Sequence, residues 1–290
     1  MTLFDLAAEG ARSLQAAGVP DPENDARLLL YEAFHLDMVH FLMNRLQPLD
    51  LSEEETQKNI GAYREMILCR SRRIPLQQIL GSQEFMGLTF LVTPHVLIPR
   101  QDTETLVEQV LCDHQSPDRR LLDVCTGSGC IAVSLAVKGG YQSVTATDVS
   151  EQALAAARQN WENLKPENPE QNFAFFQGDL FDALPSEAEA FDIITSNPPY
   201  IPSEVIKGLE PEVRDHEPIL ALDGMEDGLF FYRRLAAEAG AWLKEGGSIY
   251  LEIGHDQGAV VKELLKKAGF KNVKVIKDLP GNDRVVTGVK

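Results

Sequence analysis

Apolar positions at helical spacing fill the first part of the chain, residues 1–75. The apolar face of the first predicted helix consists of Leu3, Leu6, Ala7 and Leu14. Asp21-Pro22 predicts the start of a second helix. Ser52, with Glu55 three residues later, predicts a capping box ahead of a third. No segment here alternates as a strand does, so we expect a small helical domain.

The spacing changes over residues 76–98, where β-rich runs flank a glycine. Gly87 divides the apolar and β-branched residues of 85–92, which is typical of a hairpin. We expect this hairpin to link the helical domain to a second domain, residues 99–290.

Strand and helix patterns alternate from residue 120 onward. Short apolar runs predict strands at residues 121–125, 144–148, 173–177, 191–196 and 248–253. Helical patterns lie between them, for example at residues 153–161 and 232–243. Two closing strands, joined by a tight loop, are predicted at residues 273–276 and 285–289. The fold class is therefore α/β: a Rossmann-like, mostly parallel seven-stranded sheet with an antiparallel end and helices on both faces.

A glycine-containing turn follows the first of these strands and leads into a helix from Ile131. Its residues are Cys125, Thr126, Gly127, Ser128 and Gly129. Glycines let the backbone approach a ligand closely, and a helix N-terminus favours a carboxylate or hydroxyl groups. The turn fits poorly the Gly-x-Gly-x-x-Gly pattern of dinucleotide-binding domains. This favours S-adenosylmethionine, which has no pyrophosphate, over NAD.

Two acidic residues at the ends of the next strands support the same ligand. Asp148 ends the second strand, where a carboxylate accepts both hydroxyls of a ribose. Asp179 and Leu180 follow the third strand, and the Asp179 carboxylate suits an adenine amino group. We expect these residues and the glycine turn to bind S-adenosylmethionine, with Asn197 also adjoining the cofactor.

The motif Asn197-Pro198-Pro199-Tyr200 follows the fourth strand, at the carboxyl end where open α/β sheets bind ligands. Its prolines stiffen the loop and remove two backbone donors, so the carbonyl of Pro198 is free to accept a hydrogen bond. Asn197 adds a second acceptor and Tyr200 an aromatic face. We predict that these residues bind substrate and catalyse methyl transfer to an NH2 group on a planar π system. The alternative is a stiff loop around a buried tyrosine.

Composition and charge narrow the substrate class. The 290 residues carry a net charge of −17, which repels phosphate at long range and argues against nucleic acid. The one dense basic cluster, Arg70-Ser71-Arg72-Arg73, is expected at a solvated helix end.

The four cysteines show no Cys-x-x-Cys pairing, which indicates reduced thiols of a cytoplasmic protein and no metal site. We expect neither a signal peptide nor a membrane span.

The tetrapeptide and three further stretches resemble the HemK/PrmC family, the protein-(glutamine-N5) methyltransferases. The stretches are 98–104, Glu217-Pro218 with Ala221-Leu222, and 251–254 with Gln257. The resemblance implies a class I S-adenosylmethionine-dependent methyltransferase whose N-terminal domain recognises the substrate. It also implies that the substrate is the Gly-Gly-Gln glutamine of class 1 peptide-chain release factors. One departure is Cys125, where the family usually has glycine.

Two other functions and several roles stay open. A DNA or RNA amino-methyltransferase, acting on adenine N6 or cytosine N4, uses the same tetrapeptide. The second alternative is a non-catalytic factor-binding protein that keeps the fold.

The roles of four further residues are expectations. Arg100 either pairs with the cofactor carboxylate or supports the hairpin, while Glu252 is expected to stabilise the motif loop. We expect His216 and His255 to be ordinary surface or loop residues.

Overall fold

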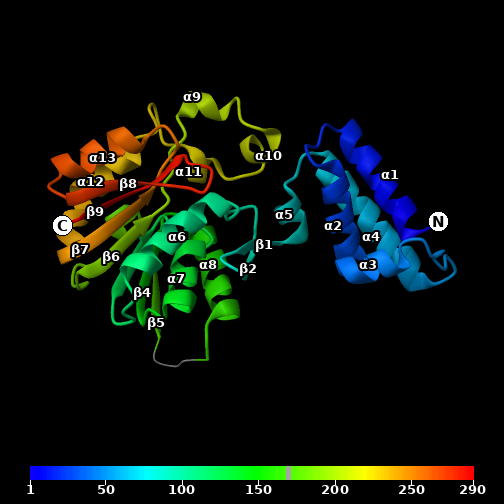
Figure 1. Cartoon of the computed structure of the whole chain (residues 1–290), viewed down its shortest axis with the longest axis horizontal. Helices are drawn as coiled ribbons and strands as arrows, with labels where there is room; N and C mark the ends of the chain where they lie inside the picture. Colours follow the sequence, from blue (N-terminus) through cyan, green and yellow to red (C-terminus); the bar gives the residue numbers. More distant parts are fainter. Residues whose placement is uncertain (168–170) are drawn as a thin grey trace. The chain divides into compact units, whose positions relative to one another are not determined.

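The computed structural model describes residues 1–167 and 171–290, which form two compact units (Figure 1). The first unit contains residues 1–81 and 210–216, and the second contains residues 82–209 and 217–290. The helices of the first unit are α1 (Leu3–Ala16), α2 (Pro22–Phe34), α3 (Met38–Asn44), α4 (Glu54–Ser71), α5 (Leu76–Leu80) and α10 (Pro211–Arg214). No described helix is long and apolar enough to cross a membrane.

The core of the helical unit follows from the amphipathic spacing of α1. Leu3, Leu6 and Leu14 are buried in one cluster with side chains of α2 and α4. Gly10 allows α1 to lie close to α4, because a Cβ at this position would be 2.0 Å from the Tyr63 hydroxyl oxygen.

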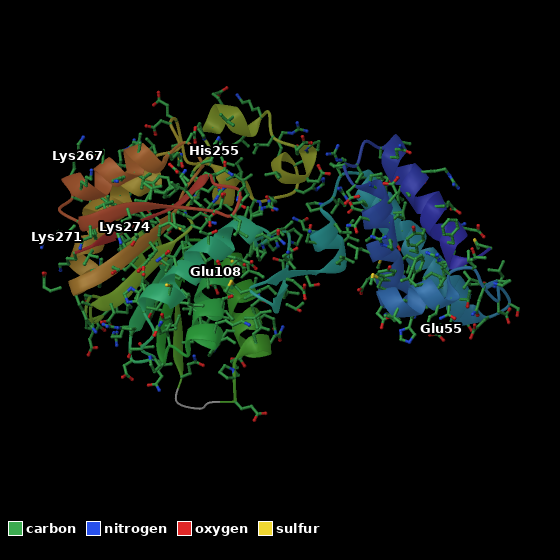
Figure 2. The ribbon with its side chains drawn as sticks, in the orientation of Figure 1. Glu55, Glu108, His255, Lys267, Lys271 and Lys274 are labelled. Atoms are coloured by element: carbon green, nitrogen blue, oxygen red, sulfur yellow. The ribbon has the colours of Figure 1, made fainter. Side chains whose placement is uncertain are left out.

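The predicted capping box of α4 is wrong. The backbone N–H and the hydroxyl of Ser52 both donate to Oδ1 of Asp50, at 2.9 and 2.6 Å. Ser52 is thereby held in the turn before the helix, and α4 follows Glu53 with no side-chain cap. Glu55, the other predicted partner, is exposed (Figure 2).

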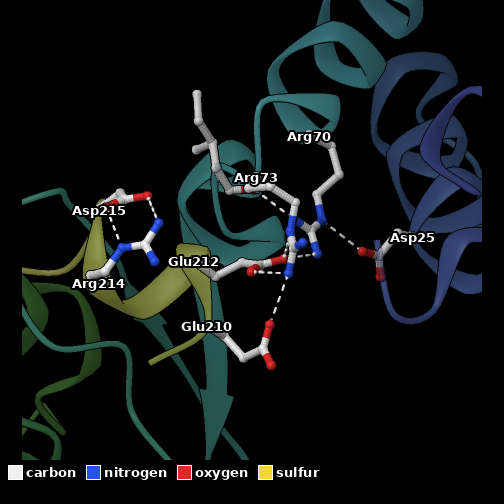
Figure 3. Close-up of polar contacts among 8 residues, drawn as sticks. Asp25, Arg70, Arg73, Glu210, Glu212, Arg214 and Asp215 are labelled. Atoms are coloured by element: carbon white, nitrogen blue, oxygen red, sulfur yellow. Dashed lines mark hydrogen bonds and ion pairs between the residues drawn. The ribbon is translucent and has the colours of Figure 1, made fainter. Parts of the chain in front are cut away.

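The basic cluster at the end of α4 contains two arginines that are not solvated as expected. Arg70 is 5% exposed and donates to Asp25 at 2.7 Å and to Glu212 at 2.9 Å. Arg73 binds both carboxylate oxygens of Glu212, at 2.6 and 2.5 Å (Figure 3). Burial of these arginine side chains is possible because each guanidinium group pairs with a carboxylate. The segment 210–216 therefore packs with the helical unit.

The second unit contains a seven-stranded sheet with the order β5-β4-β3-β6-β7-β9-β8. The strands are β3 (Arg120–Val124), β4 (Ser143–Asp148), β5 (Asn172–Gln177), β6 (Phe191–Ser196), β7 (Leu243–Glu252), β8 (Lys271–Lys277) and β9 (Asp283–Val289). The first five in this order are parallel, and β9 pairs antiparallel with both β7 and β8. The predicted fold class is confirmed.

Helices cover both faces of this sheet. One face carries α6 (Gln101–Asp113), α7 (Cys130–Gly139) and α8 (Glu151–Leu164), and the other carries α12 (Phe230–Trp242) and α13 (Gly258–Lys267) (Figure 1). Short elements follow the strands: η1 (Leu180–Ala183), α9 (Ser203–Ile206) and α11 (Ile219–Leu222). The edge strand β8 exposes Lys271 and Lys274 (Figure 2), and such charges discourage pairing with another sheet edge.

The hairpin begins later than residue 76, where we expected the linker to start. Residues 76–80 form α5, and Leu76 packs in the core of the helical unit. The hairpin consists of β1 (Ser82–Phe85) and β2 (Leu88–Leu91) and belongs to the second unit. Phe85 and Phe90 pack in the core cluster that includes side chains of α6 and α7.

Candidate active site

Strand register places the predicted site residues at one edge of the sheet. β3 pairs in parallel with β6, so the turn beginning at Cys125 and the motif beginning at Asn197 leave neighbouring strand ends. On the other side of β3, β4 ends at Asp148, and β5 then brings Asp179 to the same edge. Because the carboxyl ends of parallel strands meet at one edge, residues distant in sequence converge there.

A cavity of about 390 Å³ opens at this edge, within the size range of small-molecule sites. The predicted residues that line it are Cys125, Thr126, Gly127, Ser128, Asp148, Asp179, Leu180, Asn197 and Pro199. Gly129, Pro198 and Tyr200 are not among the lining residues. Gly129 instead lets the turn lie close to α8, since a Cβ there would be 3.0 Å from the Cβ of Ala157.

The glycine turn has an unusual backbone at its first residue. Cys125 has a φ of 60°, in the left-handed region that Gly127 and Gly129 also occupy. A side chain in this region costs roughly 1–2 kcal/mol, which is a physical reason for a glycine at this position. Burial also raises the pKa of the Cys125 thiol, so the thiol stays protonated at neutral pH.

Asp148 combines backbone hydrogen bonds with remaining acceptor capacity. One carboxylate oxygen accepts from the N–H of Gly127 and the other from the N–H of Ser150, both at 2.9 Å. An ionised carboxylate has about four acceptor positions, so two remain for ligand hydroxyls. Burial raises the pKa of Asp148, and the backbone hydrogen bonds oppose this shift. The two free positions fit the pair of hydroxyls on a ribose.

Asp148→Ala is expected to weaken S-adenosylmethionine binding by ten-fold or more. Each hydrogen bond lost to a charged acceptor costs roughly 1.5–3 kcal/mol. Isothermal titration calorimetry measures the dissociation constant, and Asp182→Ala, an exposed carboxylate in η1, is the matched control. Unchanged affinity in Asp148→Ala would mean that the ribose binds elsewhere.

The third strand end contributes Asp179 and Leu180. Asp179 lines the cavity and accepts a hydrogen bond from Arg234 at 2.7 Å through Oδ2. Leu180 is buried, lines the cavity and has a φ of 51°. This arrangement puts one carboxylate and one apolar side chain on the same wall.

Sequence analysis did not identify Asp123, which connects the glycine turn to β6. Its carboxylate accepts from the hydroxyls of Thr126 at 2.6 Å and Thr195 at 2.7 Å. Burial raises its pKa to about 7, and these hydrogen bonds oppose the shift. An aspartate inside an otherwise apolar strand was the available signal.

The motif presents acceptors at the end of β6. Asn197 donates through Nδ2 to Oγ1 of Thr103 at 3.4 Å, which leaves its side-chain carbonyl to accept from a ligand. No donor among the described residues bonds to the Pro198 carbonyl. The carbonyl of Tyr200 accepts from Nε2 of Gln257 at 3.0 Å, which holds the loop. Burial raises the pKa of Tyr200 to about 12, so its hydroxyl stays neutral.

Comparison with known proteins identifies the family. The model described as "PrmC N-terminal domain" matches residues 5–81, and "Methyltransferase small domain" matches residues 101–207. The "Release factor glutamine methyltransferase" of Geobacter sulfurreducens is 40% identical over 276 residues, covering 95% of this chain and 92% of that protein. The chain belongs to the release factor glutamine methyltransferase family. The protein of the same name from Clostridium botulinum is 37% identical and covers 100% of both chains.

A solved structure agrees with the fold of this methyltransferase. A methyltransferase from Pyrococcus furiosus matches 71% of this chain and 90% of its own, with 23% identity and a TM-score of 0.52. At this identity the likeness concerns the fold alone.

Arg100 lines the cavity and forms an ion pair that was not predicted from the sequence. Its Nη2 donates to Oε2 of Glu217 at 2.6 Å, and the other oxygen of Glu217 accepts from the N–H of Ile98 at 3.2 Å. Burial raises the pKa of Glu217, which Arg100 opposes. The pair joins two segments that line the cavity, 95–100 and 218–221. The role of Glu217 was missed because its partners are distant in sequence.

The remaining candidates lie apart from this chemistry. His255 is exposed in the turn after β7 (Figure 2), and His216 accepts a hydrogen bond from Gln78 through its backbone carbonyl. Residues 1–167 and 171–290 contain no group of three His, Cys, Asp or Glu side chains that could hold a metal ion.

Proposed function

We propose that this methyltransferase transfers a methyl group from S-adenosylmethionine to the side-chain nitrogen N5 of the glutamine in the Gly-Gly-Gln motif of class 1 peptide-chain release factors. The observation that carries the proposal is the pair of acceptors at Asn197 and Pro198, at the strand end beside a cavity lined by the glycine turn and Asp148. The family of the chain supports the substrate class.

The cavity residues fit the proposed cofactor. Asp148 would accept the ribose hydroxyls, Asp179 would accept from the adenine amino group, and the turn 125–129 would adjoin the methionine end. When bound, S-adenosylmethionine supplies a methyl group on a positively charged sulfur. The protein then has to orient the acceptor nitrogen and exclude water from it.

Orientation is the main task, because an amide nitrogen is a poor nucleophile whose lone pair is delocalised into the carbonyl. The side-chain carbonyl of Asn197 and the backbone carbonyl of Pro198 would accept the two amide N–H groups of glutamine. This fixes the direction of the lone pair, and such alignment supplies roughly 7–11 kcal/mol of a barrier. No general base is needed before transfer, since the methylated nitrogen becomes acidic and loses its proton to water.

Selection of the protein substrate requires contacts away from the reacting atom, because one glutamine side chain is chemically like another. We assign this recognition to the helical unit. Its exposed apolar side chains on α3 and the following turn are Met38, Val39, Leu42, Met43 and Leu46. Exposed apolar groups gathered in one segment are typical of protein-binding surfaces. A release-factor substrate would place the enzyme in the cytoplasm with the translation machinery.

Methyl transfer from labelled S-adenosylmethionine tests the proposal. The acceptors compared are an intact release factor, a short Gly-Gly-Gln peptide, DNA and RNA. We expect label in the intact factor, much less in the peptide and none in nucleic acid. Label in DNA or RNA alone would establish the amino-methyltransferase alternative. Cofactor binding without transfer to any acceptor would establish the non-catalytic one.

A further inference from the structure

The rotamer of Asp179 determines which of its carboxylate oxygens faces the cavity. Asp179 lines the cavity, but its side chain is 54% exposed. A side chain with this much exposure ordinarily moves among several staggered rotamers. Burial therefore does not fix the Asp179 carboxylate in one orientation, and a contact with another residue is needed to do so.

That contact comes from Arg234 on α12. Its Nη1 donates to Oδ2 of Asp179 at 2.7 Å, and its Nε donates to Oε1 of Glu238, one helical turn further along, at 3.2 Å. Arg234 is not among the residues that line the cavity. Because the guanidinium group is planar and pairs with a carboxylate on each of two nitrogens, it holds the Asp179 side chain from outside the cavity.

The ion pair engages one of the two Asp179 oxygens. Among the residues that the structure describes, no donor bonds to the other oxygen, Oδ1. An ionised carboxylate only accepts hydrogen bonds, so Oδ1 remains for an N–H group of a ligand. Phe231 lies three residues before Arg234, on the same side of α12, and lines the cavity. This helix thus contributes an aromatic ring and, through Arg234, a fixed carboxylate.

We propose that Arg234 is a positioning residue for cofactor recognition, which holds Asp179 so that Oδ1 accepts a hydrogen bond from the amino group of adenine. The inference rests on the proposed function, because it places the base of the cofactor beside Asp179. It makes Arg234 a determinant of base selectivity. A base with an oxygen in place of the amino group would set that oxygen against the carboxylate, acceptor against acceptor, and would bind weakly.

Loss of the guanidinium group would free the carboxylate to turn toward water. In that orientation Asp179 neither accepts from an amino group nor repels an oxygen. Affinity for an adenine ligand should therefore fall, whereas affinity for the corresponding oxo ligand should not. A partly exposed ion pair contributes little to folding stability, so the change should leave the fold intact.

Calorimetry of the full-length protein with S-adenosylhomocysteine and S-inosylhomocysteine tests the inference. In the second ligand an oxygen replaces the amino group of the base. We expect the wild-type protein to favour the adenine ligand by roughly a hundred-fold. Arg234→Met keeps most of the side-chain length without the charge, and should lower this ratio of affinities roughly ten-fold. A purely structural role would weaken both ligands alike and leave the ratio unchanged.

Arg233→Met is the matched control. Arg233 is the preceding residue of α12 and pairs with Asp227 at 2.9 Å, with both side chains about half exposed. This variant should keep the wild-type ratio. Asp179→Asn shows whether Arg234 acts through Asp179. It should lower the ratio by itself, and adding Arg234→Met to it should cause no further fall, since the effects of residues that act together are not additive.

A wild-type ratio in Arg234→Met would overturn the inference, and so would an equal fall in Arg233→Met or a further fall in the double variant. If Arg234→Met does not fold, Glu238→Gln decides, because it removes the second carboxylate that holds the guanidinium group and should lower the ratio by a smaller factor. Equal affinity of the wild-type protein for both ligands would remove Asp179 from the base site and overturn the inference as well. Methylation of a release factor is measured separately, so a failure of the proposed function is distinguished from these results.

Discussion

Asn197→Ala is expected to lower kcat for release-factor methylation roughly a hundred- to a thousand-fold. Removing one preorganised hydrogen-bonding group from a reacting centre typically has an effect of this size. The variant loses one of the two acceptors that would orient the glutamine nitrogen, and the Pro198 carbonyl alone leaves the amide free to rotate. Cofactor affinity should change by only a few-fold, because Asp148 and the glycine turn remain.

Single-turnover kinetics and calorimetry separate these two effects. Asn163→Ala removes an exposed asparagine from α8 and should leave both quantities unchanged. Wild-type turnover in Asn197→Ala would show that the motif does not act on the substrate nitrogen. A parallel loss of cofactor affinity would assign Asn197 to the cofactor instead.

Arg70→Ala is expected to destabilise the helical unit by roughly 3–5 kcal/mol, because it leaves the buried carboxylate of Asp25 without its cation, while Glu212 keeps Arg73. Arg70 donates to Asp25, Glu212 and the carbonyl of Ile74 (Figure 3). Burial already raises the pKa of Asp25, which the Arg70 hydrogen bond opposes. Burial would also raise the pKa of Glu212, but hydrogen bonds from the arginines outweigh it and hold that pKa low.

Hydrogen exchange of the amides in α2 and α4 measures this loss in the intact chain. Arg64→Ala is the matched control on the same helix. Arg64 pairs with Glu9 at 3.2 Å, with both side chains about half exposed, and such a surface pair contributes at most about 1 kcal/mol. Equal protection in the two variants would contradict the account of the buried cluster.

Periodicity predicted the sheet well because most of its strands contain a short apolar run bounded by turn residues. The carboxyl ends of neighbouring parallel strands meet at one edge, so Cys125, Asp148, Asp179 and Asn197 could be placed together from the sequence. The prediction failed where a residue formed a different local hydrogen bond from the one expected. At Ser52, the carboxylate of Asp50 holds the hydroxyl that was expected to cap α4.

Contacts between distant side chains have no local pattern and could not be predicted. Glu212 lies far along the chain from Arg70, and Glu217 far from Arg100, yet both pairs form ion pairs in the structure. Thr103 was noted only as part of the stretch 98–104 that resembles the family, although its hydroxyl contacts Asn197. Such pairs depend on how whole helices and strands pack against one another. Composition and residue spacing carry no information about that packing.

The position of the transferred methyl group tests the central claim most directly. An unmethylated class 1 release factor is incubated with the enzyme and S-adenosylmethionine, digested, and analysed by tandem mass spectrometry. The account predicts one added methyl group on the side-chain nitrogen of the Gly-Gly-Gln glutamine, and none when that glutamine is replaced. A methyl group on any other residue, or an unmodified factor in the presence of active enzyme, would contradict it.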